Sequence, residues 1–167
     1  TVIYVVAKDL AGNVGRPATT TVDSRPPDAP LVNATNGSVV AGTAEANSVV
    51  TVKDATGKLI GSTTADAAGK FSVAPAAQLA DGTVLHVTAA DAVGNVSAEG
   101  LATVDRVPPA APSVDPTHGS AITGRAEPGS VVTVRDVSGN VVGSATVGSN
   151  GFYSIAPKTP PVDGAVL

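Results

Sequence analysis

Apolar side chains alternate with polar ones over several short stretches of this chain. The alternating apolar positions are Val50 and Val52, Phe71 and Val73, and Leu85, Val87 and Ala89. A period of two is typical of a strand that buries one face of a sheet. β-Branched residues dominate these stretches and Gly or Pro interrupts them repeatedly, so the pattern predicts strands rather than helices.

Within one stretch of the chain, turn-forming residues divide the pattern into seven short strands. The predicted strands cover residues 30–34, 38–45, 48–54, 58–65, 69–74, 83–90 and 95–104. Seven strands with regular turns predict an all-β fold of two packed sheets, a β-sandwich of the immunoglobulin-like type. The sequence has no Cys and no Trp, so the disulfide and core tryptophan of antibody domains are absent.

The sequence repeats itself without gaps at an offset of 82 residues. Of the 85 positions that overlap at this offset, 40 are identical. Pro-rich stretches, Pro26-Pro27 and Pro108-Pro109 among them, indicate the unit boundaries. The predicted organisation is the last strands of one immunoglobulin-like unit (1–23), a complete unit (24–105) and a unit without its last strands (106–167). Proline restricts the backbone, so we expect semi-rigid linkers.

Composition excludes several classes of function. A chain without Cys has neither disulfides nor thiol chemistry, and its two His residues are too few for most catalytic metal centres. Its net charge of −4 argues against nucleic-acid partners. Apolar runs are too short for membrane insertion. Because the sequence does not begin with Met, we expect a mature product or a piece of a longer protein.

Individual His and aromatic residues fit a structural role. His86 and His118 occupy different places in their units and are expected on the surface, and no Ser-His-Asp set is apparent. Strand alternation points Phe71 and Tyr153 inward and leaves Phe152 exposed. No enzymatic activity is therefore predicted.

Three stretches together resemble the bacterial immunoglobulin-like repeats of giant surface adhesins and biofilm-associated proteins of Gram-negative bacteria. They are Gly42-Thr43-Ala44-Glu45 with Ser48-Val49-Val50-Thr51-Val52, Asp91-Ala92-Val93-Gly94-Asn95-Val96-Ser97, and the junction from Val104-Asp105 to Pro112. The resemblance implies a long non-catalytic rod of many units at the bacterial cell surface. It also implies extracellular secretion in one step without disulfides, and Ca²⁺ at the joints between units.

Acidic residues gather where such a calcium site would lie, because the loops after the second, fourth and sixth strands return to one end of the sandwich. These loops and the adjacent linker carry Asp23, Asp28, Glu45, Asp66 and Asp91. Carboxylates are preferred calcium ligands. We expect Asp23, Glu45 and Asp91 to bind Ca²⁺, with Asp66 and Asp28 optional.

The opposite end of the unit offers a second candidate joint, where Asp105 would face Glu127 of the next unit. Asp66 has no counterpart in that unit, where Gly148-Ser149-Asn150 replaces Asp66-Ala67-Ala68. The alternative to calcium is local: in Asp91-x-x-Gly94-Asn95 the carboxylate can cap backbone amides of a tight loop. Both interpretations stay open at this point.

The leading hypothesis is a structural stalk, with the neighbouring units of the same chain as partners. One alternative is a module that binds host glycans or proteins, which the scarcity of aromatic and Arg side chains disfavours. Another is a spacer attached to an extracellular enzyme. A further hypothesis is head-to-tail self-association, in which the N-terminal hairpin of one molecule completes the C-terminal unit of the next.

Overall fold

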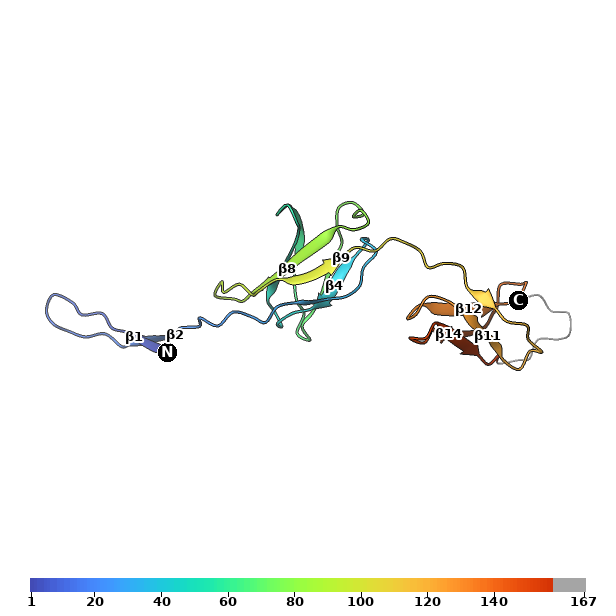
Figure 1. Cartoon of the computed structure of the whole chain (residues 1–167). Helices are drawn as coiled ribbons and strands as arrows, with labels where there is room; N and C mark the ends of the chain where they lie inside the picture. Colours follow the sequence, from blue (N-terminus) through green and yellow to red (C-terminus); the bar gives the residue numbers. More distant parts are fainter. Residues whose placement is uncertain (158–167) are drawn as a thin grey trace. The chain divides into compact units, whose positions relative to one another are not determined.

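The computed structural model describes residues 1–157, and over this range the chain is built from strands, with no helix (Figure 1). Its contacts divide it into two compact units, Thr1–Arg106 and Val107–Leu167. The all-β prediction is confirmed. Since the described part contains no helix, none is present there that is long and apolar enough to cross a membrane.

The chain begins with a two-stranded hairpin. Strand β1 (Val2–Val5) pairs antiparallel with β2 (Ala18–Thr21), and Lys8 forms a bridge with Val14 nearer the loop. All residues from 1 to 26 are exposed. No other strand of the described residues joins this two-stranded sheet.

Residues 31–103 form a sandwich of two antiparallel sheets. The first sheet has the order β3 (Leu31–Val32), β4 (Val40–Thr43), β7 (Lys70–Val73). The second has the order β6 (Leu59–Thr64), β5 (Val49–Asp54), β8 (Val84–Ala90), β9 (Gly100–Thr103). All seven predicted strands are present, although several are shorter than the sequence pattern predicts.

The core of this sandwich lies between the two sheets and follows the predicted alternation. Val50, Val52, Leu85 and Val87 have no exposed surface, while the residues between them reach solvent. Phe71 is 4% exposed and packs beside Gly42. A Cβ at Gly42 would lie 2.0 Å from the Leu31 carbonyl oxygen and 2.9 Å from the phenyl ring, so the close approach of β3 and the packing of Phe71 both require glycine there.

The start and the end of the sandwich are joined directly. Thr35 and Val104 form a parallel bridge, and the backbone N–H of Asp105 donates to the Thr35 carbonyl at 3.0 Å. The strand ladders of the described residues are antiparallel, so this bridge differs from them in direction. Val104 is 1% exposed and belongs to the core.

The second compact unit repeats the first part of this plan. One sheet has the order β10 (Ser113–Val114), β11 (Ile122–Arg125), β14 (Phe152–Ile155), and the other contains β12 (Val131–Arg135) and β13 (Val141–Thr146). Tyr153 is 4% exposed and donates its hydroxyl to the Ser113 carbonyl at 2.8 Å. Phe152 is 46% exposed, with the Arg125 guanidinium 3.7 Å above its ring. The predicted orientations of Phe71, Tyr153 and Phe152 are therefore correct.

Candidate functional site

Five loops of the described structure share one short sequence, Asp-x-x-Gly followed by Asn or Lys, and we call them DxxG turns. Each begins with an Asp at or within four residues of the end of a strand and returns through a glycine with positive φ. They cover residues 9–13, 54–58, 66–70, 91–95 and 136–140. Five of the 14 acidic residues therefore occupy the same structural position, and two of them, Asp66 and Asp91, are also candidate calcium ligands.

The carboxylate of Asp91 shows how these turns are built. Its Oδ1 accepts backbone N–H bonds from Val93, Gly94 and Asn95 at 2.9, 2.8 and 2.9 Å. Its Oδ2 accepts the Asn95 side-chain amide at 2.7 Å. Gly94 has φ of +95°, a conformation that residues with a Cβ rarely adopt. One carboxylate thus satisfies the amides of the whole loop.

The same arrangement lowers the pKa of several of these carboxyl groups. At Asp9 and Asp136 the largest cause is the side-chain hydrogen bond from Asn13 or Asn140, and at Asp54 it is the bond from Thr56. At Asp91, desolvation raises the pKa, but the hydrogen bonds from Asn95 and the loop amides together outweigh it. Hydrogen bonds to the ionised form favour that form. The turns of Asp9, Asp54, Asp91 and Asp136 therefore favour the carboxylate form.

The loop that lost its Asp in the second unit keeps the same backbone course. The Gly148 N–H donates to the Phe152 carbonyl at 3.0 Å, and Gly151 N–H to the Gly148 carbonyl at 2.9 Å. Asn150 supplies the side-chain acceptor instead, since its Oδ1 accepts the Phe152 N–H at 3.1 Å. In the first unit, Asp66 Oδ1 accepts the N–H groups of Ala68 and Lys70 at 2.9 and 2.8 Å. A neutral acceptor thus replaces the carboxylate here.

Three of the predicted calcium ligands line one hollow of about 290 Å³. Asp23, Glu45 and Asp91 contribute to its wall. The Asn95 side chain connects the linker to this loop, donating to the Asp23 carbonyl at 3.3 Å. Asp23 Oδ1 itself accepts the Arg25 N–H at 3.1 Å.

The two optional ligands lie apart from this hollow. Asp28 shares a neighbouring hollow with Glu45, and Asp66 lines neither of the two. The Ala44 N–H donates to the Gly69 carbonyl at 2.8 Å, so the loops that carry Glu45 and Asp66 are joined through their backbones. The prediction that the loops after the second, fourth and sixth strands meet at one end therefore identified loops that neighbour one another. It did not determine where each acidic side chain lies.

The candidate residues of the second joint belong to different compact units: Asp105 to the first and Glu127 to the second. Near Asp105, the carboxylate of Asp81 accepts the Arg106 backbone N–H at 2.7 Å. Glu127 accepts from Ser130 through its main-chain carbonyl, in the same way as Glu45 accepts from Ser48. The pairing of Asp105 with Glu127 stays a prediction.

The side chains as placed do not fit a calcium coordination sphere. Within residues 1–157 no group of three or more His, Asp or Glu side chains is arranged to hold a metal ion. Calcium needs six to eight oxygen ligands, and both Asp91 oxygens already accept bonds within their own loop. The geometry supports the loop-capping role of Asp91, and calcium binding stays a prediction.

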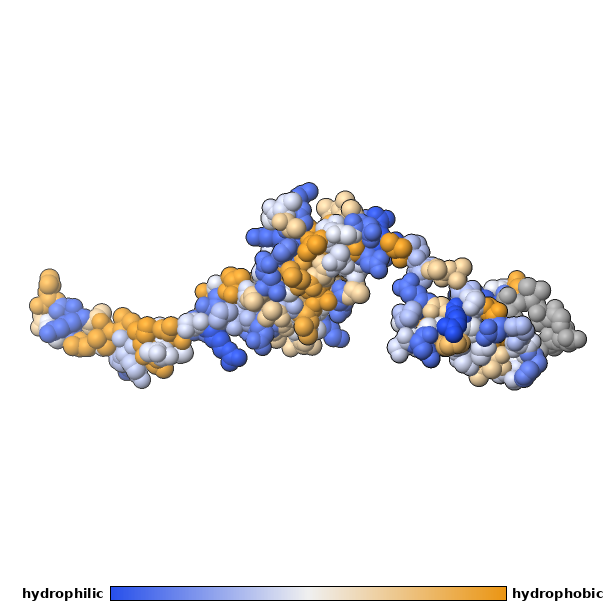
Figure 2. Space-filling view, viewed as in Figure 1, coloured by the Kyte–Doolittle hydropathy of each residue, from blue (hydrophilic) through white to orange (hydrophobic). Residues whose placement is uncertain are grey.

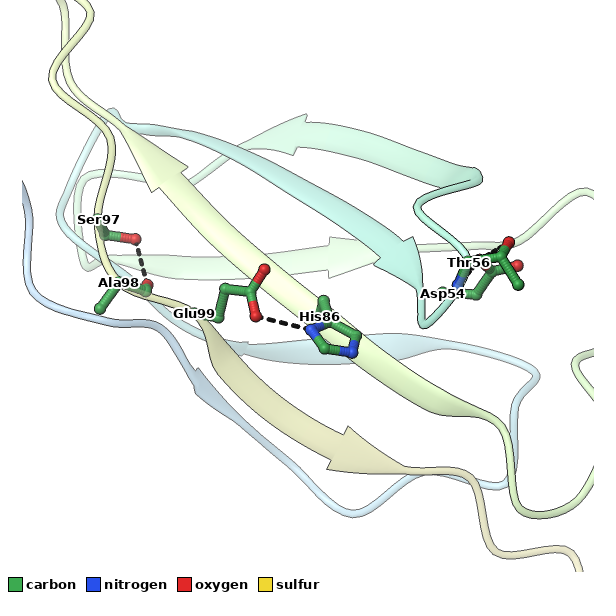
Figure 3. Close-up of polar contacts among 6 residues, drawn as sticks. All are labelled: Asp54, Thr56, His86, Ser97, Ala98 and Glu99. Atoms are coloured by element: carbon green, nitrogen blue, oxygen red, sulfur yellow. Dashed lines mark hydrogen bonds and ion pairs between the residues drawn. The ribbon is translucent and has the colours of Figure 1, made fainter.

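His86 has one partner that sequence reasoning missed. Its Nδ1 lies 2.7 Å from Oε2 of Glu99, and both side chains point to the outer face of the sheet (Figure 3). Ser97 hydrogen-bonds elsewhere, donating to the Ala98 carbonyl at 2.7 Å and accepting the Ala89 N–H at 2.9 Å. His86 and Ser97 therefore do not form a nucleophile–base pair.

Comparisons with known proteins place this geometry in a family. The family model described as bacterial Ig domain matches residues 26–105 and again 108–167. A search of curated proteins returned no match. A solved structure titled "Biofilm associated protein - BSP domain" is similar at 26% identity and a TM-score of 0.39, over 82% of this chain and 25% of that one.

A second solved structure, the FN1–FN3 domains of chicken CNTN1, is similar at 14% identity and a TM-score of 0.42, over 95% of this chain and 68% of that one. The chain spans about a quarter of the length of the biofilm-associated protein structure. Both TM-scores are below 0.5, so the assignment depends on the family model. Its two matches cover most of the sequence. The chain belongs to the bacterial Ig domain family, of which it carries two consecutive copies.

Proposed function

We propose that this chain is a spacer, a section of the stalk of a bacterial cell-surface or secreted adhesin that takes part in cell adhesion or biofilm formation. The observation that carries the proposal is the tandem repeat: the family model matches twice, with two residues between the matches. Each copy has its own hydrophobic core. Repetition of one small domain extends a chain without adding chemistry, which is what a spacer requires.

The surface supports a spacer more than a binding module. The sequence has four aromatic residues, and in the described structure Phe71 and Tyr153 are buried. Of the exposed pair, Phe152 has one face of its ring against Arg125, and Tyr4, 70% exposed, lies on the first hairpin. Aromatic and Arg side chains dominate protein-binding hot spots. The ligand-binding alternative therefore has few exposed aromatic side chains to use.

Binding assays on the purified chain test this part of the proposal. We expect no specific binding when it is screened on glycan arrays and against extracellular host proteins. A ligand that binds with saturable, micromolar affinity would overturn the spacer function. Phe152→Ala is the matched variant for any such ligand, because it removes the exposed ring while leaving the buried Tyr153 in place.

Calcium-dependent stiffening is the finer part of the proposal. It rests on three carboxylates, Asp23, Glu45 and Asp91, that line one hollow beside the linker. Binding would require these side chains to turn toward a common ion. Small-angle scattering and thermal melting of the chain in calcium and in chelator provide the test.

If calcium binds there, the ion raises both the maximum particle dimension and the Tm, and Asp23→Asn with Glu45→Gln abolishes both effects. Those two substitutions leave the hydrogen bonds of Asp91 within its loop in place. The variant and the wild type should therefore have the same Tm in chelator, which serves as the control. Identical scattering in calcium and chelator would overturn the calcium part alone, since the spacer function does not depend on it.

A further inference from the structure

The chain stays bound to the complete unit for several residues after its last strand, β9. Val104 is 1% exposed, and it is held on both sides of its main chain. Its N–H donates to the Thr83 carbonyl at 2.9 Å, and its carbonyl accepts the Gly82 N–H at 2.8 Å. The N–H of the next residue, Asp105, donates to the Thr35 carbonyl at 3.0 Å.

Arg106 is the next residue to be held, through both its main chain and its side chain. Its backbone N–H donates to Oδ1 of Asp81 at 2.7 Å, and its Nη2 donates to Oε1 of Gln78 at 3.2 Å. Both acceptors belong to the loop between β7 and β8. Figure 2 shows hydrophilic surface at the end of the unit where the chain leaves it, and all three residues are exposed. We call Gln78 and Asp81 together the Arg106 clamp.

Basic residues in exposed linkers are the positions at which trypsin-like proteases cut a chain, because these enzymes bind an Arg or Lys side chain in an acidic pocket. Each of the two Pro-rich linkers has one such residue, Arg25 in the first and Arg106 in the second. Arg25 is followed by Pro26, whose ring and missing N–H make the bond between them a poor substrate. Arg106 is followed by Val107, which is 69% exposed. Proline therefore protects the bond after Arg25 and does not protect the bond after Arg106.

We propose that the Arg106–Val107 peptide bond is a cleavage site for trypsin-like proteases that the Arg106 clamp keeps closed. Such a protease binds the residues around the bond as an extended strand and takes the Arg side chain into its pocket. In the folded chain that side chain already binds Gln78, and the backbone N–H groups of residues 104–106 already have acceptors. Cleavage therefore requires Arg106 and the chain before it to detach first.

The reaction is hydrolysis of one peptide bond. The bond between the carbonyl carbon of Arg106 and the nitrogen of Val107 breaks, and one water molecule supplies the new carboxyl group of Arg106 and the new amino group of Val107. This bond joins the two compact units, Thr1–Arg106 and Val107–Leu167. One cut would therefore separate them without breaking the chain inside either core, and a stalk cut here would release whatever it carries beyond the bond.

Digestion of the 167-residue chain with trypsin under native conditions, followed by mass spectrometry, tests the proposal. A synthetic peptide of residues 103–110 gives the rate at which the same bond is cut without the clamp. We expect the bond in the protein to be cut at least about a hundredfold more slowly, since cleavage of a protected bond follows the population of the opened chain. Equal rates in the protein and the peptide would overturn the proposal.

Substitutions in the clamp test which contacts keep the bond closed. Asp81→Ala removes the acceptor of the Arg106 N–H and should raise the rate of cleavage after Arg106 at least about tenfold, because hydrogen bonds to charged groups are the stronger ones. Gln78→Ala removes the acceptor of the guanidinium and should raise the rate as well. Asp81→Asn is the matched control, because it keeps an oxygen acceptor and should stay closer to the wild type. Wild-type rates in both alanine variants would overturn the proposal.

Cleavage after Lys70 separates local detachment from general unfolding. Phe71, the next residue, is 4% exposed, so a protease reaches this bond only when the sandwich opens. The rate after Lys70 should be the same in the wild type and in the clamp variants. An equal rise after Lys70 and after Arg106 in both Asp81→Ala and Gln78→Ala would show that the clamp acts only on overall stability, and would overturn the proposal.

Val107→Pro identifies the fragments. It gives the second linker the sequence Arg-Pro-Pro that the first linker has from Arg25 to Pro27. The cut after Arg106 should then disappear, both alone and in combination with Asp81→Ala. Fragments that persist unchanged in Val107→Pro would come from another bond, and would overturn the assignment of this site.

Discussion

At the scale of single residues, the acidic side chains of this protein act mainly within their own loops. The DxxG sequence occurs five times, and in each case the Asp carboxylate accepts the backbone N–H four residues later. Sequence reasoning gave this role as an alternative for Asp91 and did not extend it to the other four turns. The spacing Asp-x-x-Gly was the signal that would have identified all of them.

Substitutions at Asp91 separate loop capping from calcium binding. Asp91→Ala removes four accepted hydrogen bonds and should lower the Tm of the first unit in the presence of chelator. Asp91→Asn keeps an oxygen acceptor for the loop amides and should melt close to the wild type, because Asn150 fills such a role in the second unit. Equal Tm values for wild type and Asp91→Ala would contradict the capping role.

The lowered pKa values of Asp9, Asp54, Asp91 and Asp136 make stability depend on pH in the acidic range. A folded-state pKa below the ordinary Asp value of 3.8 means that the unfolded chain binds protons first as the pH falls. The stabilising contribution is complete above that value and is lost as the pH falls through the lowered folded-state values.

We therefore expect these carboxyl groups to leave the Tm unchanged between neutral pH and about pH 5. Below about pH 4 their protonation in the unfolded chain should lower the Tm. Thermal melts followed by circular dichroism over this range provide the measurement. Asp54→Asn, which cannot ionise at that position, should make the acid limb shallower. A Tm that rises on acidification would show that these carboxylates destabilise the fold.

At the scale of strands, the period-two pattern predicted the buried faces of β5, β7 and β8, and turn-forming residues delimited the other strands of the complete unit. The strand ends were less predictable. Residues 95–99 were expected to belong to the last strand, but β9 begins at Gly100. There the pairing with β8 is reduced to a bridge between Ala90 and Val96, and the Ser97 hydroxyl rather than a main-chain carbonyl accepts the Ala89 N–H. Such contacts depend on the tertiary fold.

Strand β8 offers the sharpest test of the predicted core. Leu85 has no exposed surface, and Leu85→Ala should lower the free energy of unfolding of the first unit by ~2–5 kcal/mol. Val84, its neighbour, is 37% exposed, and Val84→Ala should change that free energy by less than ~1 kcal/mol. Urea unfolding of both variants measures the difference. Equal effects would contradict the inward and outward assignment of β8.

At the scale of the molecule, the chain is a repeat whose two units, as far as the structure describes them, have cores of different size. In the described residues, the first core contains nine buried residues and the second five. The repeat offset places the counterpart of Val84, the first residue of β8, at Val166, outside the described residues, so the expected lack of the last strands in the second unit stays a prediction. The sequence could not predict that three carboxylates share a hollow without forming a metal site, because that depends on side-chain directions in three separate loops.

Calorimetry should resolve this difference as two melting transitions, with the second unit melting first because its described residues bury fewer apolar side chains. Leu85→Ala should lower the upper transition and leave the lower one in place, which assigns each transition to its unit. Measurement at low concentration keeps association of copies from raising the lower Tm. A single transition that shifts as a whole in the variant would show that the two units unfold together.

The parallel bridge between Thr35 and Val104 determines how the complete unit carries mechanical load. Because the two segments run in the same direction, the chain enters the Thr35 segment at one end of the contact and leaves the Val104 segment at the other end. Tension on the linkers therefore slides the two segments past each other, so that the Asp105–Thr35 hydrogen bond and the neighbouring β3–β9 packing resist together rather than opening one after another. A unit built this way yields at a higher force than a hairpin that is pulled apart from one end.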